Sequence, residues 1–144
     1  MTAQQYTGEA VSLLSHLIAT PSVSRDERRA ADIMEEELTR CGFTPHREAN
    51  NVWAIGPCQR EDRPTLLLNA HIDTVKPVAS YTRNPYEPSL EDGTLYGLGS
   101  NDCGGGLVSL LQVFRELSAS ERCPYNLVYL ASAEEEVAGK DGIS

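Results

Sequence analysis

The chain has 144 residues, and its 21 acidic and 12 basic side chains give a formal charge of −9. This acidic balance argues against nucleic acid or an anionic membrane as a partner, because binding phosphate needs a surplus of Lys and Arg. Hydrophobic residues make up 40% of the chain, so it can bury a core, and its length favours a single domain.

Two helices are predicted in the first part of the chain. The first covers residues 4–19, where apolar residues recur at helical spacing up to the break at Pro21. Ser24 and Glu27 have the spacing of a capping box and predict the start of a second helix, which ends at Gly42. The dipole of this second helix favours an acidic residue at its start, which is sufficient to explain Glu27 without a functional role.

Strands alternate with a further helix in the rest of the chain. Apolar runs of strand length cover residues 51–55, 65–71 and 126–131, and a brief strand is expected at 95–97. The run at 65–71 shows no alternation, which is typical of a strand buried on both faces. A proline-rich loop precedes 95–97, and a third helix follows the three glycines at 104–106. This order predicts an α/β sandwich.

Neither a membrane span nor a secretion signal is predicted. No apolar run approaches the roughly 18 residues of a transmembrane helix, and the first residues lack the basic and apolar regions of a signal peptide. The four cysteines lie far apart and form no CxxC pair, so we expect free thiols. The sequence therefore indicates a cytoplasmic protein without a membrane partner, and its three histidines leave any metal site dependent on carboxylates.

The first candidate site segment lies at the end of the run 65–71. Strand side chains alternate, so His71 and Asp73 are expected to point to the same side. An aspartate in that position can fix the orientation of a metal-binding imidazole. A single histidine at a strand end is more often a hydrogen-bonded core residue, so this pair alone is weak evidence for a metal.

The second candidate segment is the glycine-rich stretch 97–106, which contains Asp102. Backbone amides before a helix can bind a phosphate, but the spacing matches no phosphate-binding motif and Asp102 would repel a phosphate. Glycines that bring Asp102 close to a metal ion explain the segment better. An ordinary tight turn is the alternative.

The third candidate segment is the triplet Glu134-Glu135-Glu136, which follows the run 126–131 after two intervening residues. Three adjacent acidic residues usually lie in a turn that water solvates. Beside a buried strand their negative charges are unfavourable unless water solvates them or a cation neutralises them. In extended backbone, one glutamate could bind a metal while its neighbour faces the reacting water. Together with His71 and Asp102, the triplet predicts a zinc site, because zinc accepts imidazole and carboxylate ligands.

The segments LLLNAHIDTV, GLGSNDCGGGL and ASAEEEVAG, in this order, resemble the dinuclear-zinc amidohydrolase and exopeptidase family. Its members include acetylornithine deacetylase, succinyl-diaminopimelate desuccinylase, aminoacylase, carboxypeptidases and dipeptidases. The resemblance covers nearly the whole chain and points most closely to acetylornithine deacetylase-like enzymes. It implies a zinc-exopeptidase-like catalytic domain in which a mixed sheet is sandwiched by helices. It also implies two zinc ions, for which cobalt can substitute.

The resemblance gives each candidate residue a role. His71 would bind one zinc, Asp73 would orient His71, Asp102 would bridge both ions, Glu135 would be the general base, and Glu136 would bind the other zinc. Glu134 stands where the family usually has Asp, and a shift of one residue would move the base to Glu134. Many relatives have Asp-Met-Lys-Gly-Gly where this chain has Asp-Cys-Gly-Gly-Gly at 102–106, so the lysine is missing.

The implied reaction is zinc-dependent hydrolysis of the amide bond of an N-acyl amino acid, with N-acetylornithine deacetylation in arginine biosynthesis as the leading expectation. Residues 1–144 would be the N-terminal portion of the catalytic domain of a homodimeric enzyme. The dimerisation domain and the remaining ligands would lie outside this chain, which would be inactive by itself. The alternative substrates are those of a dipeptidase, tripeptidase or desuccinylase. A different class of alternative is a truncated protein that only binds metal or pairs with another subunit.

Overall fold

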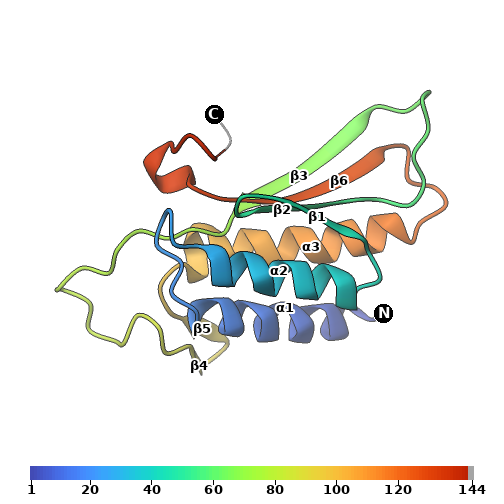
Figure 1. Cartoon of the computed structure of the whole chain (residues 1–144). Helices are drawn as coiled ribbons and strands as arrows, with labels where there is room; N and C mark the ends of the chain where they lie inside the picture. The colour runs from blue at the N-terminus through green and yellow to red at the C-terminus, as the bar shows by residue number, and fades with distance from the viewer. Residues whose placement is uncertain (143–144) are drawn as a thin grey trace.

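Three helices lie on the same side of a β-sheet in the computed structural model, which describes residues 1–142; two of them lie next to the sheet and the first helix of the chain lies on their far side (Figure 1). The helices are α1 (Ala3–Ile18), α2 (Arg28–Arg40) and α3 (Gly105–Ser118). The predicted α/β fold is confirmed. Ile143 and Ser144, the end of the expected domain, lie outside the described residues. None of the helices in the described part is both long enough and apolar enough to cross a bilayer.

The main sheet has four strands in the order β1-β2-β6-β3 and is mixed, as expected. Its strands are β1 (Pro45–Glu48), β2 (Asn51–Ile55), β3 (Thr65–His71) and β6 (Asn126–Ser132). β3 and β6 run parallel, whereas β2 pairs with both β1 and β6 in antiparallel orientation. The sequence did not predict β1, because this edge strand of Pro, His, Arg and Glu has no apolar pattern.

A separate hairpin consists of β4 (Ser89–Glu91) and β5 (Thr94–Tyr96). Asp92 and Gly93 connect the two strands with φ angles of 47° and 80°, and an Asp-Gly pair favours this left-handed conformation in a two-residue turn. The sequence predicted β5 and missed β4, because a strand of only Ser, Leu and Glu is too short for alternation to be recognised.

The two faces of the main sheet differ in their cover. Leu127 and Tyr129 of β6 are buried in the core beneath the helices, whereas Val128 between them is only half-buried. Leu67 of β3 is opposite Val128 in the strand register and is 51% exposed. Within residues 1–142 the helices cover one face only (Figure 1). β3 is therefore not buried on both faces as predicted, and a second helical layer is not among the described residues.

Large side chains from the helices and the sheet fill the core. The largest apolar side chains that are fully buried are Met34, Leu38, Leu107, Leu111, Phe114 and Tyr129. The ring centroid of Phe114 lies 4.6 Å from that of Phe43 and 5.8 Å from that of Tyr129. The Tyr129 hydroxyl donates a hydrogen bond to the carbonyl of Leu107 at 3.0 Å. These contacts join α3 to β6 and so fix the position of the loop that precedes α3.

We expect Phe114→Ala to lower the free energy of unfolding by about 3–5 kcal/mol, because it leaves a cavity among well-packed rings. Urea denaturation of the purified protein measures this loss. The adjacent Val113 is 44% exposed, so Val113→Ala serves as the control and should cost less than about 1 kcal/mol. Equal losses for the two variants would contradict the described packing of α3.

Candidate metal centre

The three candidate segments come together at one end of the main sheet. β3 and β6 run parallel with His71 opposite Ser132, so the segments that follow the two strands leave the sheet side by side. The beginnings of α2 and α3 lie at the same end (Figure 1). Open α/β sheets commonly bind ligands beyond the carboxyl ends of their strands, and the predicted site residues occupy this position.

His71, the last residue of β3, lies at the centre of the cluster and is only 7% exposed. Its Nδ1 lies 2.9 Å from the carbonyl oxygen of Asp73 and 3.4 Å from Asp73 Oδ1. Its Nε2 lies 3.1 Å from Asp102 Oδ1 and 3.7 Å from Glu135 Oε2. Because Nδ1 faces acceptors on Asp73, the neutral imidazole carries its proton on Nδ1 and presents the lone pair of Nε2 to the carboxylates.

Asp73 connects the strand end with two other segments and is 1% exposed. Its Oδ2 accepts hydrogen bonds from Ser24 Oγ at 2.7 Å and from the Glu136 amide at 3.1 Å. Its Oδ1 accepts from the Glu135 amide at 3.1 Å. Burial raises the pKa of this carboxyl, but the hydrogen bonds from His71, Ser24 and the two amides together lower it to about 2. Asp73 therefore remains a carboxylate near neutral pH, as its predicted orienting role requires.

Asp102 lies in the tight turn Ser100–Gly104, and its side chain is 76% exposed. The Gly104 amide donates to the Gly99 carbonyl at 2.8 Å and closes this turn. Gly99 has a φ of 75°, and a Cβ at this position would lie 2.6 Å from Thr74 Cγ2. Only glycine fits there without strain. The glycines thus let the backbone bring Asp102 to His71, in line with the metal-binding interpretation of the segment.

The glutamate triplet is not extended, so the predicted alternation of its side chains is wrong. Glu134 has a left-handed conformation with φ of 56° and ψ of 24°, and Glu135–Val137 forms a short 3₁₀ helix. The turn forms at this position because the carboxylate of Asp73 accepts the first two amides of that helix. A carboxylate that binds the free amides at a helix start stabilises this conformation.

The turn separates Glu134 from the other two glutamates. Glu135 and Glu136 lie in one cluster with His71. Glu134 is buried to 7% exposure, and its Oε2 lies 3.8 Å from Arg25 Nε. Gly139 makes room for it, because a Cβ on Gly139 would overlap the Glu134 carboxylate. The geometry therefore brings Glu135 and Glu136, and not Glu134, to the histidine.

Two groups of possible metal ligands share His71. One consists of His71, Asp102 and Cys103, and the other of His71, Glu135 and Glu136, with the ligand atoms of each group within 4.8 Å of one another. Burial, and next the charge of Asp102, raise the pKa of Glu136, so a cation between these carboxylates would relieve their repulsion. The imidazole and carboxylates fit zinc. The sequence-based site did not include Cys103.

Ser24 is a site residue to which the sequence assigned a different role. The predicted capping box is wrong, because Glu27 is the residue before α2 and no side chain caps this helix. Ser24 instead donates its hydroxyl to Asp73, which is 49 residues away in the chain. A parallel bridge between Val23 and Thr74 holds the two segments together. The spacing of Ser24 and Glu27 could not show this contact, because it fits a local capping box equally well.

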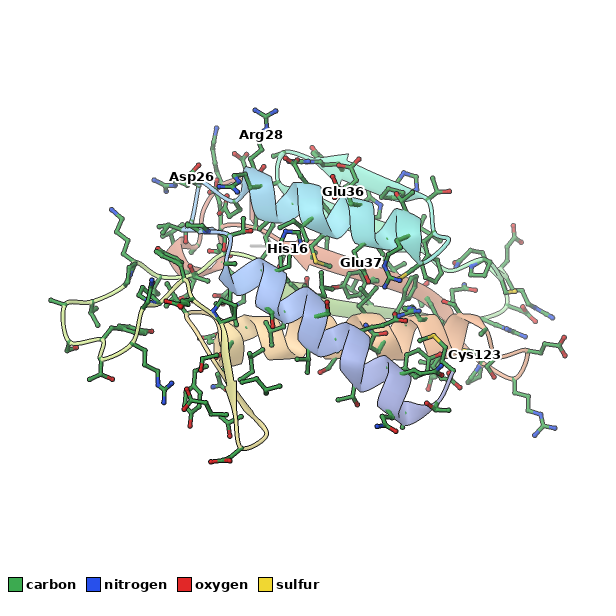
Figure 2. The ribbon with its side chains drawn as sticks, turned by 90° about the horizontal axis from the view of Figure 1, so that it is seen from below. His16, Asp26, Arg28, Glu36, Glu37 and Cys123 are labelled. Atoms are coloured by element: carbon green, nitrogen blue, oxygen red, sulfur yellow. The ribbon has the colours of Figure 1, made fainter. Side chains whose placement is uncertain are left out.

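The other two histidines lie outside this cluster. His46 stacks on Trp53, with 5.6 Å between the ring centroids. His16 lies in the groove between α1 and α2, which Glu36 and Glu37 also line (Figure 2). Within the described part of the chain, His71 is therefore the histidine that the site carboxylates surround.

We expect zinc binding to release a proton from His71. In protein stripped of metal, the carboxylate of Asp73 has the largest effect on its pKa, burial opposes this effect, Asp102 adds to it, and the pKa rises to about 10. A metal binds the deprotonated imidazole, so zinc affinity should rise with pH below 10, by up to about tenfold per unit for one proton. Calorimetry in buffers of different ionisation enthalpy counts the released protons.

The control for this measurement is His71→Asn, which removes the titrating group. The variant should release about one proton fewer than the wild type for each zinc ion that it still binds. Equal proton release from both proteins would contradict the assignment of His71 as a ligand.

The similarity of this chain to known proteins extends over all the residues of the ligand cluster. A sequence model of Peptidase family M20/M25/M40 matches residues 67–144, which contain all three candidate segments. Succinyl-diaminopimelate desuccinylase of Xylella fastidiosa (strain M23) is 29% identical over 142 residues, which cover 94% of this chain and 37% of that protein.

Solved structures of other proteins share the fold of this chain. The M20 family metallo-carboxypeptidase Sso-CP2 from Sulfolobus solfataricus matches with a TM-score of 0.74 and 22% identity, over 95% of this chain and 32% of its own. Aminoacylhistidine dipeptidase from Vibrio alginolyticus matches with a TM-score of 0.65 and 26% identity, over 91% and 28%. The chain thus spans about a third of the length of the proteins that it matches.

Proposed function

This chain belongs to peptidase family M20/M25/M40, and from that premise we propose that it forms the N-terminal portion of the catalytic domain of a metal-dependent amidohydrolase. The observation that carries the proposal is the convergence of one imidazole and several carboxylates at the ends of β3 and β6. A cluster of this kind is suited to hold a hydrolytic metal ion and to move the protons of the reaction.

The donor set supports a proposal for the residues that would hold the metal. His71, Asp102 and Glu136 are the proposed zinc ligands, with Asp102 shared between two ions in the whole protein. The exposed side chain of Asp102 leaves its second oxygen accessible to such an ion. When bound, zinc supplies Lewis acidity that polarises the scissile carbonyl and lowers the pKa of a bound water. Cobalt has a similar preference for nitrogen and oxygen ligands and is the proposed substitute.

Glu135 is the proposed general base. Its side chain is 59% exposed, and its Oε2 lies 3.7 Å from His71 Nε2, so it is at the open side of the site where a substrate arrives. Glu135 accepts a proton from the attacking water and gives this proton to the leaving amine as the C–N bond breaks. The carboxylic acid that forms then loses its remaining proton to the amine, so that the products are a carboxylate and an ammonium group. Asp73 keeps the imidazole of His71 in the required orientation throughout.

N-acyl amino acids are the proposed substrate class, with N-acetylornithine and N-succinyl-diaminopimelate as the two leading candidates. The motif resemblance favours the acetyl compound, whereas the similarity to succinyl-diaminopimelate desuccinylase supports the succinyl compound. The similarity to a dipeptidase and a carboxypeptidase makes peptides the third candidate. We further propose that the whole protein acts in the cytoplasm as a homodimer.

The substrate proposal predicts zinc-dependent release of acetate or succinate by the whole protein. A coupled assay on the zinc-loaded protein compares N-acetylornithine, N-succinyl-diaminopimelate and a set of dipeptides at equal concentration. Removal of zinc by a chelator should abolish the hydrolysis, and its return should restore it. A zinc-loaded protein that hydrolyses none of these amides would contradict the proposed function. Residues 1–144 by themselves are expected to be inactive.

We expect Glu135→Gln in the whole protein to lower kcat by about 10²- to 10⁴-fold, because an amide cannot act as a general base. Its zinc content should remain that of the wild type, because the proposed ligands are unchanged. Glu134→Gln is the matched control, since Glu134 packs beside Arg25 and lies outside the ligand cluster. The opposite result, with Glu134→Gln inactive and Glu135→Gln active, would place the base at Glu134.

A further inference from the structure

Glu27 is a buried carboxylate outside the ligand cluster, and its side chain is bound by its own segment and by two others. It is 0% exposed and lies immediately before α2, yet its side chain makes no capping hydrogen bond to that helix. A carboxylate removed from water is costly unless hydrogen bonds replace the lost hydration. The partners that replace it therefore show what this residue does.

Three N–H donors surround the Glu27 carboxylate. Its Oε1 accepts from the Arg25 amide at 2.6 Å and from the Glu134 amide at 3.3 Å. Its Oε2 accepts from Asn50 Nδ2 at 3.0 Å. Glu134 is 107 residues away in the chain, so Glu27 connects the segment before α2 to the turn that follows β6.

Side chains bind four consecutive amides in that turn. The Ala133 amide is bound by Asn51 Oδ1, the Glu134 amide by Glu27 Oε1, and the Glu135 and Glu136 amides by the two oxygens of Asp73. Glu134 has a left-handed backbone with φ of 56°, which is unfavourable for a residue with a side chain. Rotation at this residue would swing the next carboxylate, that of Glu135, away from His71.

We propose that Glu27 is a positioning residue of the hydrolytic site, which fixes the Glu134 amide and thereby the side chains of Glu135 and Glu136. This inference rests on the proposed function, because the placement of those two glutamates affects catalysis only if they act in the hydrolysis. Glu27 itself does not touch the metal or the substrate.

The neighbours of Glu27 require a carboxylate and not an amide. Asn50 donates Nδ2 to Glu27, and its Oδ1 accepts from Arg47 Nη2 at 3.3 Å. In Glu27→Gln, the new amide nitrogen would face Asn50 Nδ2, so that two donors would oppose each other. If the Asn50 amide rotated by 180° so that Oδ1 accepted this hydrogen bond, its Nδ2 would face the Nη2 donor of Arg47. Asn50→Asp removes the conflict, because aspartate accepts hydrogen bonds from both the new amide at position 27 and Arg47.

The experiment therefore compares Glu27→Gln, Asn50→Asp and the double variant in the whole zinc-loaded protein. We expect Glu27→Gln to lower kcat about tenfold to a hundredfold through misplacement of the base, with KM changed by less than about twofold. The double variant should regain kcat to within about threefold of the wild type, because the hydrogen-bonding pattern is restored. Cobalt-substituted Glu27→Gln should show a changed visible absorption spectrum, because the geometry of the ligand Glu136 changes.

The matched control is Glu37→Gln on α2. The Glu37 side chain is 12% exposed and forms an ion pair with Arg40. Removing its charge therefore tests whether a loss of helix stability alone lowers kcat. The control should keep the wild-type kcat and cobalt spectrum. A wild-type kcat in Glu27→Gln, or a folded double variant that stays as impaired as Glu27→Gln, would overturn the proposal. If Glu27→Gln does not fold, the kcat of the folded double variant decides.

Hydrogen exchange separates this inference from the proposed function. The amides of residues 133–137 should exchange at least about tenfold faster in Glu27→Gln than in the wild type, because the conflict with Asn50 displaces the side chain at position 27 and weakens its hydrogen bond to the Glu134 amide. This readout needs no substrate. If the wild type hydrolyses none of the candidate amides, the proposed function fails while the exchange rates still test the positioning role. Unchanged exchange in Glu27→Gln would overturn that role.

Discussion

The hydrogen bonds to the carboxylate of Asp73 hold together segments that are far apart in the chain. This group lies inside the protein, and within residues 1–142 it is not paired with a lysine or arginine; hydrogen bonds from a hydroxyl, an imidazole and two backbone amides compensate its charge. Each of these donors gains a fixed position in return. Ser24 fixes the loop before α2, His71 gains an oriented ring, and the acidic turn gains a defined start. An isosteric amide could not replace Asp73, because it would lose the capacity to accept all of these bonds.

The fold was largely predictable because its signals are local. Apolar spacing identified the helices and the three longer strands, and the Asp-Gly pair is a turn signal that needs no distant partner. The exceptions were β1 and β4, which are short and carry polar residues, so no periodicity distinguishes them from a loop. The exposed face of β3 was also unpredictable, because an unbroken apolar run does not show which of its side chains are buried by another element.

The candidate site was predictable in composition but not in its internal contacts. His71, Asp102 and the glutamates stand out because polar residues directly follow buried strands or glycines. Ser24 and Glu27, in contrast, have the spacing of a local capping box and use their side chains 49 and 107 residues away. The same pair of residue types fits both roles, so spacing alone could not choose between them. The direction of the glutamates depends equally on distant acceptors, which replace the expected extended backbone by a turn.

The close packing of Glu134 against Gly139 links two positions that sequence analysis treats as independent. The resemblance places aspartate at position 134 in most relatives, and aspartate is shorter by one methylene group. A Cβ on Gly139 would lie 2.6 Å from the Cβ of residue 134 as well as overlapping the glutamate carboxylate, and aspartate carries the same Cβ. Position 139 is therefore restricted to glycine whichever of the two acids stands at position 134.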